Sequence, residues 1–334
     1  MTLFVILVLA PGLYLLCSPL LDPAYGWREI AQAWSMNERR LTLIGNSLGV
    51  AGGTATASLL LGLRLAIWLA RSDLRWRQGW LLIMLAPLLV PSHVHAIAWR
   101  YLNIVDGLFG SILVMTLALF PFTVFLCLAG LATIDPRMEE AGMQFGSNHR
   151  VFRHITLPLL IPYLLAAWVI VFVLAVTNYG VPAVLGLNTY PVEIFAQFSA
   201  FYDRNAAMVQ VVPLVILLML LLLLQKWVMG SRPYVTLGGL HHRGELYWHL
   251  QGWQWLAQLV FLLLLGLALL LPILVLFLMA GGIQAFGQAW VNALDTILFS
   301  VALAGAVSLL CVVVAFPCAY LLARSGRWSR TLLD

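Results

Sequence analysis

The chain has 334 residues, of which 63% are hydrophobic and only 9% charged, and it carries a net charge of +5. Soluble domains contain about 25% charged residues, so this composition excludes a soluble protein. Apolar runs such as Val211–Leu224 do not alternate with polar residues, which excludes a membrane β-barrel and predicts an all-α integral membrane protein.

Eight apolar runs approach the roughly 20 residues that a membrane-spanning helix needs. They predict about eight transmembrane helices, at 1–20, 43–70, 80–103, 109–133, 159–180, 207–229, 253–280 and 294–323. The first run lacks a basic segment and a small-residue cleavage site, so we interpret it as an anchor helix and not as a removable signal. The four cysteines fall within apolar runs and are interpreted as buried hydrophobes, without a disulfide or a metal site.

Basic residues gather on one predicted side of the membrane. Twelve of the 18 follow spans two, four, six and eight: Arg71, Arg75, Arg77, Arg137, Arg150, Arg153, Lys226, Arg232, Arg243, Arg324, Arg327 and Arg330. Cytoplasmic loops carry an excess of lysine and arginine, so these ends and the N-terminus are predicted to be cytoplasmic. The basic excess is attributed to orientation in the lipid bilayer, and no nucleic acid is expected as a partner.

Polar residues within or at the end of two spans are candidates for a transport pathway. His93 and His95 follow Pro91 in span three; they either line a route or satisfy carbonyls that the proline kink frees, and we favour the second interpretation. Asn178 and Tyr179 end span five at a Gly-Val-Pro sequence. They are interpreted either as part of a gate, where the helix unwinds, or as an ordinary helix end.

A polar segment, residues 135–162, separates spans four and five. Asp135 is placed to cap a helix that starts at Pro136, and Gly146 is expected to end that helix. Ser147 or Asn148 is expected to cap a second short helix. Two short helices joined at a glycine would form a rigid protrusion, which we call the elbow (residues 135–158); a loop lying on the membrane surface is the alternative.

The elbow resembles the Glu-Ala-Ala loop of permease subunits of binding-protein-dependent ABC importers. The residues that carry this resemblance are Glu139, Glu140, Ala141, Gly142, Gly146, Ile155, Leu157 and Pro158. Gly142 stands where the family pattern has its second alanine, and Gly146 lies one residue closer to Ile155 than the pattern places it. The resemblance implies a type I ABC importer permease fold, in which this loop docks on an ATP-binding subunit.

The sequence also repeats. Trp68-Leu69-Ala70-Arg71-Ser72 recurs 253 residues later as Leu321-Leu322-Ala323-Arg324-Ser325. We therefore expect an anchor helix and outer segment at 1–40, a five-span permease core at 41–230, a cytoplasmic linker at 231–252 and the start of a second, incomplete unit at 253–334. Chains with two such units resemble iron(III)- and thiamine-type permeases, and residues 189–195 (Thr-Tyr-Pro-Val-Glu-Ile-Phe) are most similar to the iron(III) type.

The resemblance implies a transporter subunit, not an enzyme, in a bacterial inner membrane. The only lysine, Lys226, is not in a Walker loop, so no catalytic residue, cofactor or metal is assigned to this chain and ATP is expected on two separate cytoplasmic subunits. A periplasmic solute-binding protein is expected to deliver the solute: ferric iron first, then thiamine, polyamine or another small solute. An ion-coupled secondary transporter is the alternative function; a membrane enzyme would need a clustered polar site that the sequence lacks.

Overall fold

The computed structural model describes residues 37–229, 250–281 and 283–324, together with residues 10, 12, 14, 17–19, 34 and 35. Every regular element within these ranges is helical, which confirms the all-α prediction. The elements are α3 (Glu38–Arg71), α4 (Arg77–Ile83), η1 (Ala86–Leu89), α5 (Ser92–Tyr101), α6 (Gly107–Thr133), α7 (Pro136–Met143), α8 (Asn148–Val151), η2 (Phe152–Thr156), α9 (Leu157–Val176), α10 (Gly180–Val184), α11 (Tyr190–Ser199), α12 (Arg204–Met229), η3 (Gln251–Trp253), α13 (Gln254–Leu265), η4 (Gly266–Leu270), α14 (Leu271–Met279) and α15 (Ile283–Arg324).

The chain divides into two compact units, Glu29–Leu276 and a second one that combines Met1–Arg28 with Phe277–Asp334. The second contains α15, a helix of 42 residues with Pro317 inside it. Six described helical segments are long and apolar enough to cross a membrane, or seven if one bent pair is counted as a span. These segments correspond to predicted spans two to eight, whereas the predicted span at 1–20 and the predicted linker lie almost wholly outside the described residues.

Predicted span three, residues 80–103, is not a single straight helix. The segments Arg77–Leu89 and Ser92–Tyr101 meet at an angle of 82°. Val90 (ψ 117°) and Pro91 (ψ 137°) are both extended at this break. Steric contact between a proline ring and the preceding residue disfavours helical backbone at that residue, which explains why the helix stops at this point.

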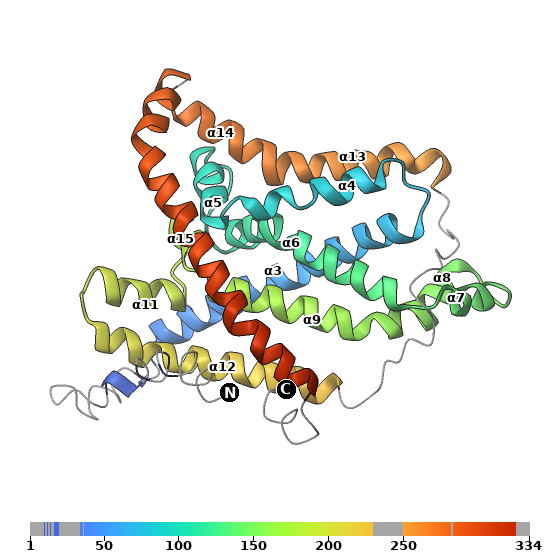
Figure 1. The fold of residues 1–334 in the computed structure, drawn as a ribbon, viewed down its shortest axis with the longest axis horizontal. Coiled ribbons are helices and arrows are strands. Elements are labelled where there is room, and N and C mark those ends of the chain that lie inside the picture. Colours follow the sequence, from blue (N-terminus) through green and yellow to red (C-terminus); the bar gives the residue numbers. More distant parts are fainter. Residues whose placement is uncertain are drawn as a thin grey trace. The chain divides into compact units, whose positions relative to one another are not determined.

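Three long helices, α3, α6 and α9, form the packed centre of the first unit and lie side by side in Figure 1. Small residues allow this close approach. A side chain at Gly62 of α3 would collide with Thr123 of α6, and one at Gly130 of α6 would come within 2.6 Å of Leu160 and Tyr163. Such small-residue contacts are typical of membrane helices, since lipid supplies no hydrophobic force that drives helices together.

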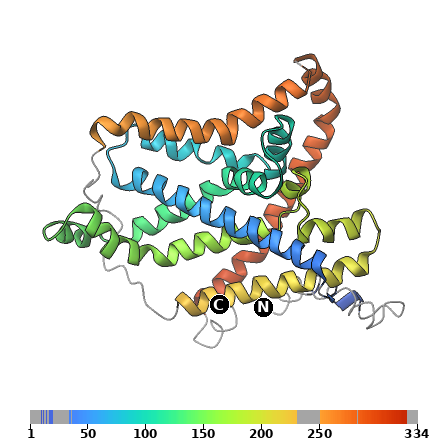
Figure 2. The same ribbon diagram turned by 180° about the vertical axis from the view of Figure 1, so that it is seen from behind.

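Helix α3 runs past α6 and α9 over most of its length (Figure 2). Its first turn is capped by Asn37, whose side chain accepts a hydrogen bond from the Arg40 amide at 2.9 Å. The other end is Arg71, whose charge is favourable at a helix C-terminus because the last carbonyl groups give that end a partial negative charge.

The segment after the undescribed linker packs back on the preceding helices. Phe261 of α13 is fully buried, and its ring lies 5.2 Å from that of Trp80 and 6.3 Å from that of Trp68. Asp73, just after α3, accepts hydrogen bonds from the Leu250 amide at 2.7 Å and from the Gln254 side chain at 3.1 Å. The start of α13 is therefore held at the same end of the unit as the end of α3.

Candidate functional site

The first arm of the elbow begins as the sequence predicts. Asp135 is the N-cap of α7, and its carboxylate accepts a hydrogen bond from the Arg137 amide at 3.0 Å. Pro136 occupies the first helical position, where its missing N–H group costs nothing. Glu139 lies in the first turn, so its negative charge is favourable at this end of the helix.

The turn between the two arms differs from the prediction. Helix α7 ends at Met143, three residues before Gly146, and Gly146 does not adopt the left-handed conformation of a glycine C-cap. The helix ends in a tighter turn instead, in which two backbone hydrogen bonds join residues three apart, from the Gln144 amide to the Ala141 carbonyl and from the Phe145 amide to the Gly142 carbonyl. The expectation that Gly146 ends the helix is therefore wrong.

The second arm is not a separate helix. After Ser147, the N-cap of α8, residues 148–176 continue without a break through η2 into α9. Residues Phe152–Thr156 form a π-helical turn, in which the Leu157 amide bonds to the Phe152 carbonyl. Pro158 explains this turn, because it has no N–H group and its ring would collide with the carbonyl four residues earlier in a regular α-helix.

Gly142 lets the two arms approach each other. A Cβ atom at this position would lie 2.6 Å from Cδ1 of Ile155 and 3.2 Å from Cγ2 of Val151. Val151 is 3% exposed, so this contact belongs to the interior of the elbow. In this chain the terminal methyl group of Ile155 occupies the space that an alanine methyl group at 142 would need.

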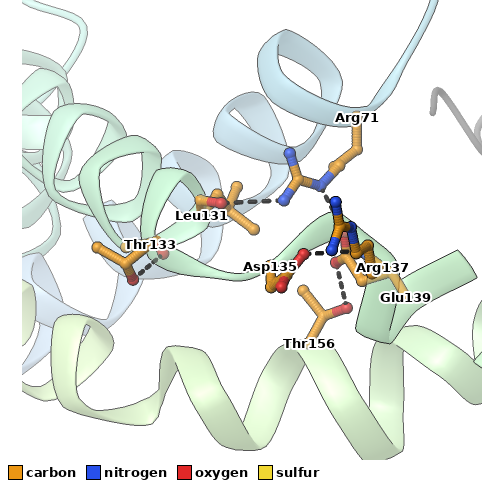
Figure 3. A network of polar contacts seen from close by, with 8 residues as sticks. Arg71, Leu131, Thr133, Asp135, Arg137, Glu139 and Thr156 are labelled. Carbon is orange, nitrogen blue, oxygen red and sulfur yellow. Dashed lines mark hydrogen bonds and ion pairs between the residues drawn. The ribbon is translucent and has the colours of Figure 1, made fainter. Parts of the chain in front are cut away.

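The two adjacent acids of α7 have different environments. Glu139 is 1% exposed, whereas Glu140 is only partly buried. Thr156 Oγ1 donates a hydrogen bond to Glu139 Oε1 at 2.7 Å, and Arg71 Nε lies 3.0 Å from Glu139 Oε2 (Figure 3). Arg71 Nη2 also donates to the Leu131 carbonyl at 2.9 Å, in the last turn of α6.

Arg71, Glu139 and Thr156 form a buried network, which we call the Arg71 network. The side chains of Arg71 and Glu139 are 10% and 2% exposed. Removing one member of a buried ion pair costs about 3–5 kcal/mol, because the remaining charge loses its partner. The sequence assigns Arg71 to the orientation charges and to the repeat, but it does not predict the contact with Glu139. The signal in the sequence is an arginine at the end of a span, preceded by Leu-Ala and followed by Ser as at Arg324.

The outer surface of the elbow combines large apolar side chains with cations. Phe145 is 86% exposed and Met138 is 50% exposed. Arg137, Arg150 and Arg153 are exposed on the same short segment. Of the other residues that carry the resemblance, Ala141 and Pro158 are exposed, while Ile155 and Leu157 are partly buried.

Three of the four pathway candidates meet at the opposite end of the unit. The Asn178 side chain donates a hydrogen bond to Ser92 Oγ at 2.9 Å and accepts one from the Val181 amide at 3.0 Å. A Cβ atom at Gly180 would lie 3.1 Å from Cβ of His93, so His93 lies against the break between α9 and α10. The Tyr179 ring stacks on that of Phe195, with centroids 4.3 Å apart.

His95 lies apart from these three residues. Its side chain is fully buried, close to the Pro87 carbonyl, but it makes no hydrogen bond of normal geometry with any described residue. His95 therefore does not satisfy the Pro87 carbonyl, and the interpretation that the histidines satisfy carbonyls freed by the proline kink stays a prediction.

Charged residues at this end are engaged locally. Glu193 Oε2 lies 2.7 Å from Arg39 Nη2, which ties α11 to the start of α3. Asp203 accepts a hydrogen bond from the Ala206 amide at 2.9 Å and so caps α12. Within the described ranges no three His, Cys, Asp or Glu side chains come together in a way that could hold a metal ion.

Comparison with known proteins gives a family match over the central part of the chain. Residues 58–230, just over half of the sequence, match the family described as "Binding-protein-dependent transport system inner membrane component". This range contains the whole elbow and the pathway candidates.

Individual relatives carry different solute names. The ferric transport system permease protein of Actinobacillus pleuropneumoniae is 25% identical over 231 residues, covering 61% of this chain and 33% of the relative. The molybdate/tungstate transport system permease protein of Thermococcus kodakarensis is 26% identical over 197 residues, covering 57% and 78%. The putrescine transport system permease protein of Escherichia coli is 25% identical over 178 residues, covering 48% and 62%. The match thus spans about a third of the length of the ferric relative.

Proposed function

The chain belongs to the family of binding-protein-dependent transport system inner membrane components, and from this premise we propose that it is a membrane-spanning permease subunit of an ABC importer whose elbow binds a separate ATP-binding subunit. The observation that carries the proposal is the contrast between the two sides of the elbow. Its inner side is fixed by the Arg71 network and by the contact of Gly142 with Ile155. Its exposed surface carries the apolar side chains of Phe145 and Met138.

An 86% exposed phenylalanine at the tip of an ordered polar segment needs a physical reason. Large aromatic residues surrounded by polar groups are typical anchors of protein interfaces. The neighbouring cations Arg137, Arg150 and Arg153 favour a partner with carboxylates around an apolar groove, because complementary charge steers association. We expect two copies of the ATP-binding subunit per transporter, one for the elbow of each of two permease units.

Co-purification tests the proposal. The full chain is expressed with a candidate ATP-binding subunit of an ABC importer from the same organism, and the amount of that subunit retained by the tagged permease is measured. Phe145→Asp is expected to reduce retention at least tenfold, since a carboxylate would enter the apolar contact. Tyr202→Asp is the matched control, because Tyr202 is equally exposed (86%) but lies at the end of the unit where α11 is found. Equal retention by both variants, or no retention by the native chain, would contradict the proposal.

Ferric iron is the leading solute, supported by the similarity of residues 189–195 to iron(III)-type permeases and by the ferric relative. Molybdate and putrescine are the competing solutes, since relatives with those names match at comparable identity. A solute-binding protein outside the membrane would present the solute to the end that bears Asn178 and Tyr179. Uptake of radiolabelled ferric iron, molybdate and putrescine, compared in cells with and without the chain, distinguishes the three.

A further inference from the structure

The elbow is covalently joined to α6 and α9 only, yet its buried acid is held by a third helix. Glu139 contacts Arg71, the last residue of α3, and α3 precedes the elbow by a bent pair of helices and by α6. Arg71 also bonds to the Leu131 carbonyl, so one guanidinium group joins the ends of α3 and α6 to α7. Thr156 brings the start of the α9 segment into the same network.

Helix α3 extends from this network to the opposite end of the unit. Near its start, Ser47 Oγ accepts a hydrogen bond from the Tyr190 amide at 2.8 Å, and the Asn46 side chain donates to the Asn188 carbonyl at 2.9 Å. These contacts attach α3 to the segment that begins α11. A displacement of Arg71 along or around the axis of α3 would therefore reach the residues beside the pathway candidates.

We infer that the Arg71 network is a rigid link that makes the elbow and α3 move as one body, so that a force applied to the elbow is delivered through α3 to the far end of the unit. Arg71 and Glu139 are positioning residues: they touch neither solute nor nucleotide. That an ATP-binding subunit applies the force rests on the proposed function, but the rigidity of the link is a property of this chain alone.

The geometry of the network suits this role. The guanidinium group of Arg71 donates a hydrogen bond to the Leu131 carbonyl and forms an ion pair with Glu139, so two partners from different helices hold its position. Both charged side chains are almost completely buried, where water does not compete for the contacts. The sequence around the link recurs: α15 ends at Arg324 as α3 ends at Arg71, and both arginines follow Leu-Ala and precede Ser.

The link is tested by measuring the distance between two spin labels on the full chain. One label replaces Ser147, which is exposed in the turn of the elbow and makes no side-chain capping hydrogen bond, and the other replaces Leu60, which is 67% exposed on α3; the four native cysteines are replaced by alanine. The native background is expected to give one narrow distance distribution. It should stay unchanged when the ATP-binding subunit and a non-hydrolysable ATP analogue are added.

Two variants break the charge link in different ways. Arg71→Met combined with Glu139→Met removes both charges while keeping comparable volume, and Glu139→Gln keeps the shape and the capacity to bond to Thr156. Both are expected to broaden the distribution at least twofold even without nucleotide. Arg39→Met combined with Glu193→Met is the matched control, because it removes an ion pair at the other end of α3 and should leave the distribution narrow.

The outcomes separate this inference from the proposed function. Distributions as narrow as in the native background, in both link variants, would overturn the link whether or not the ATP-binding subunit associates. Broadened distributions in a chain that binds no such subunit would support the link and refute only the proposal that an ATP-binding subunit docks on the elbow. When the subunit is retained normally by Glu139→Gln but ATP-dependent uptake falls, the network transmits force and does not merely maintain the docking surface.

Discussion

Gly62 of α3 and Thr123 of α6 are in contact where the two helices cross. A Cβ atom at position 62 would lie 2.6 Å from Cβ of Thr123 and 3.0 Å from its backbone carbonyl carbon. Thr123 Oγ1 also donates a hydrogen bond to the Ser58 carbonyl on α3 at 2.7 Å. Because part of the obstacle is backbone, no rotation of a side chain can make room for a larger residue at 62.

Gly62→Ala is therefore expected to lower the free energy of unfolding by about 1–3 kcal/mol, the usual cost of overpacking a close contact. Reversible unfolding of the purified chain in mixed micelles, followed by its tryptophan fluorescence, measures this change. Gly52→Ala is the control, because Gly52 lies on the same helix with no atom within 4 Å of an added Cβ. An equal loss of stability in the two variants would contradict the argument.

The elbow offers a test of a paired contact. Gly142→Ala should strain the two arms, since its Cβ would lie 2.6 Å from Ile155 Cδ1. Valine lacks that δ-carbon, so Ile155→Val should relieve the strain and make the two substitutions favourable together, with a coupling energy of about 0.5–3 kcal/mol. Hydrogen exchange of the amides of α7 and α8 in a double-mutant cycle reports it. Additive effects would mean that the arms do not meet through these two residues.

Predicted spans two to eight correspond to long apolar helical segments because lipid imposes one simple rule: a helix that crosses it must be apolar for about 20 residues. The break at Val90 and Pro91 was indicated by the proline, but not its angle of 82°. That angle depends on which helices α5 packs against, α6 and α10, and a local sequence pattern carries no such information.

The sequence predicts which residues form the elbow, but not which of them are buried or what they contact. Asp135 as a helix cap follows from local chemistry, whereas the end of α7 at Met143 and the continuous second arm depend on tertiary packing. Glu139 and Glu140 are adjacent acids with the same local pattern. Which of them is buried depends on the rotation of α7 relative to the end of α3, so the partnership with Arg71 could be found only in three dimensions.

The hydrogen bond from Thr156 to Glu139 has its own expected effect. Thr156→Val keeps the shape of the side chain but removes the donor, and a hydrogen bond to a charged group contributes about 1.5–3 kcal/mol. Unfolding in mixed micelles should show a loss in this range. Thr177→Val should change stability by much less, because the Thr177 hydroxyl is exposed and bonds only to Val173 in its own helix. A loss at 177 as large as at 156 would show that valine itself, not the lost donor, is responsible.

Asp73 provides the last test, at the start of α13. Its carboxylate accepts hydrogen bonds from the Leu250 amide and the Gln254 side chain, so Asp73→Ala should destabilise this helix start by about 0.5–2 kcal/mol, as loss of a helix cap does. Hydrogen exchange of the amides at 254–258 should become faster by the corresponding factor. Asp106→Ala is the control: Asp106 precedes α6 in the cap position, but its side chain makes no capping hydrogen bond, and its carboxylate lies 3.9 Å from Arg100 on the surface. Unchanged exchange at 254–258 in Asp73→Ala would mean that α13 is held by the packing of Phe261 against Trp80 and not by its cap.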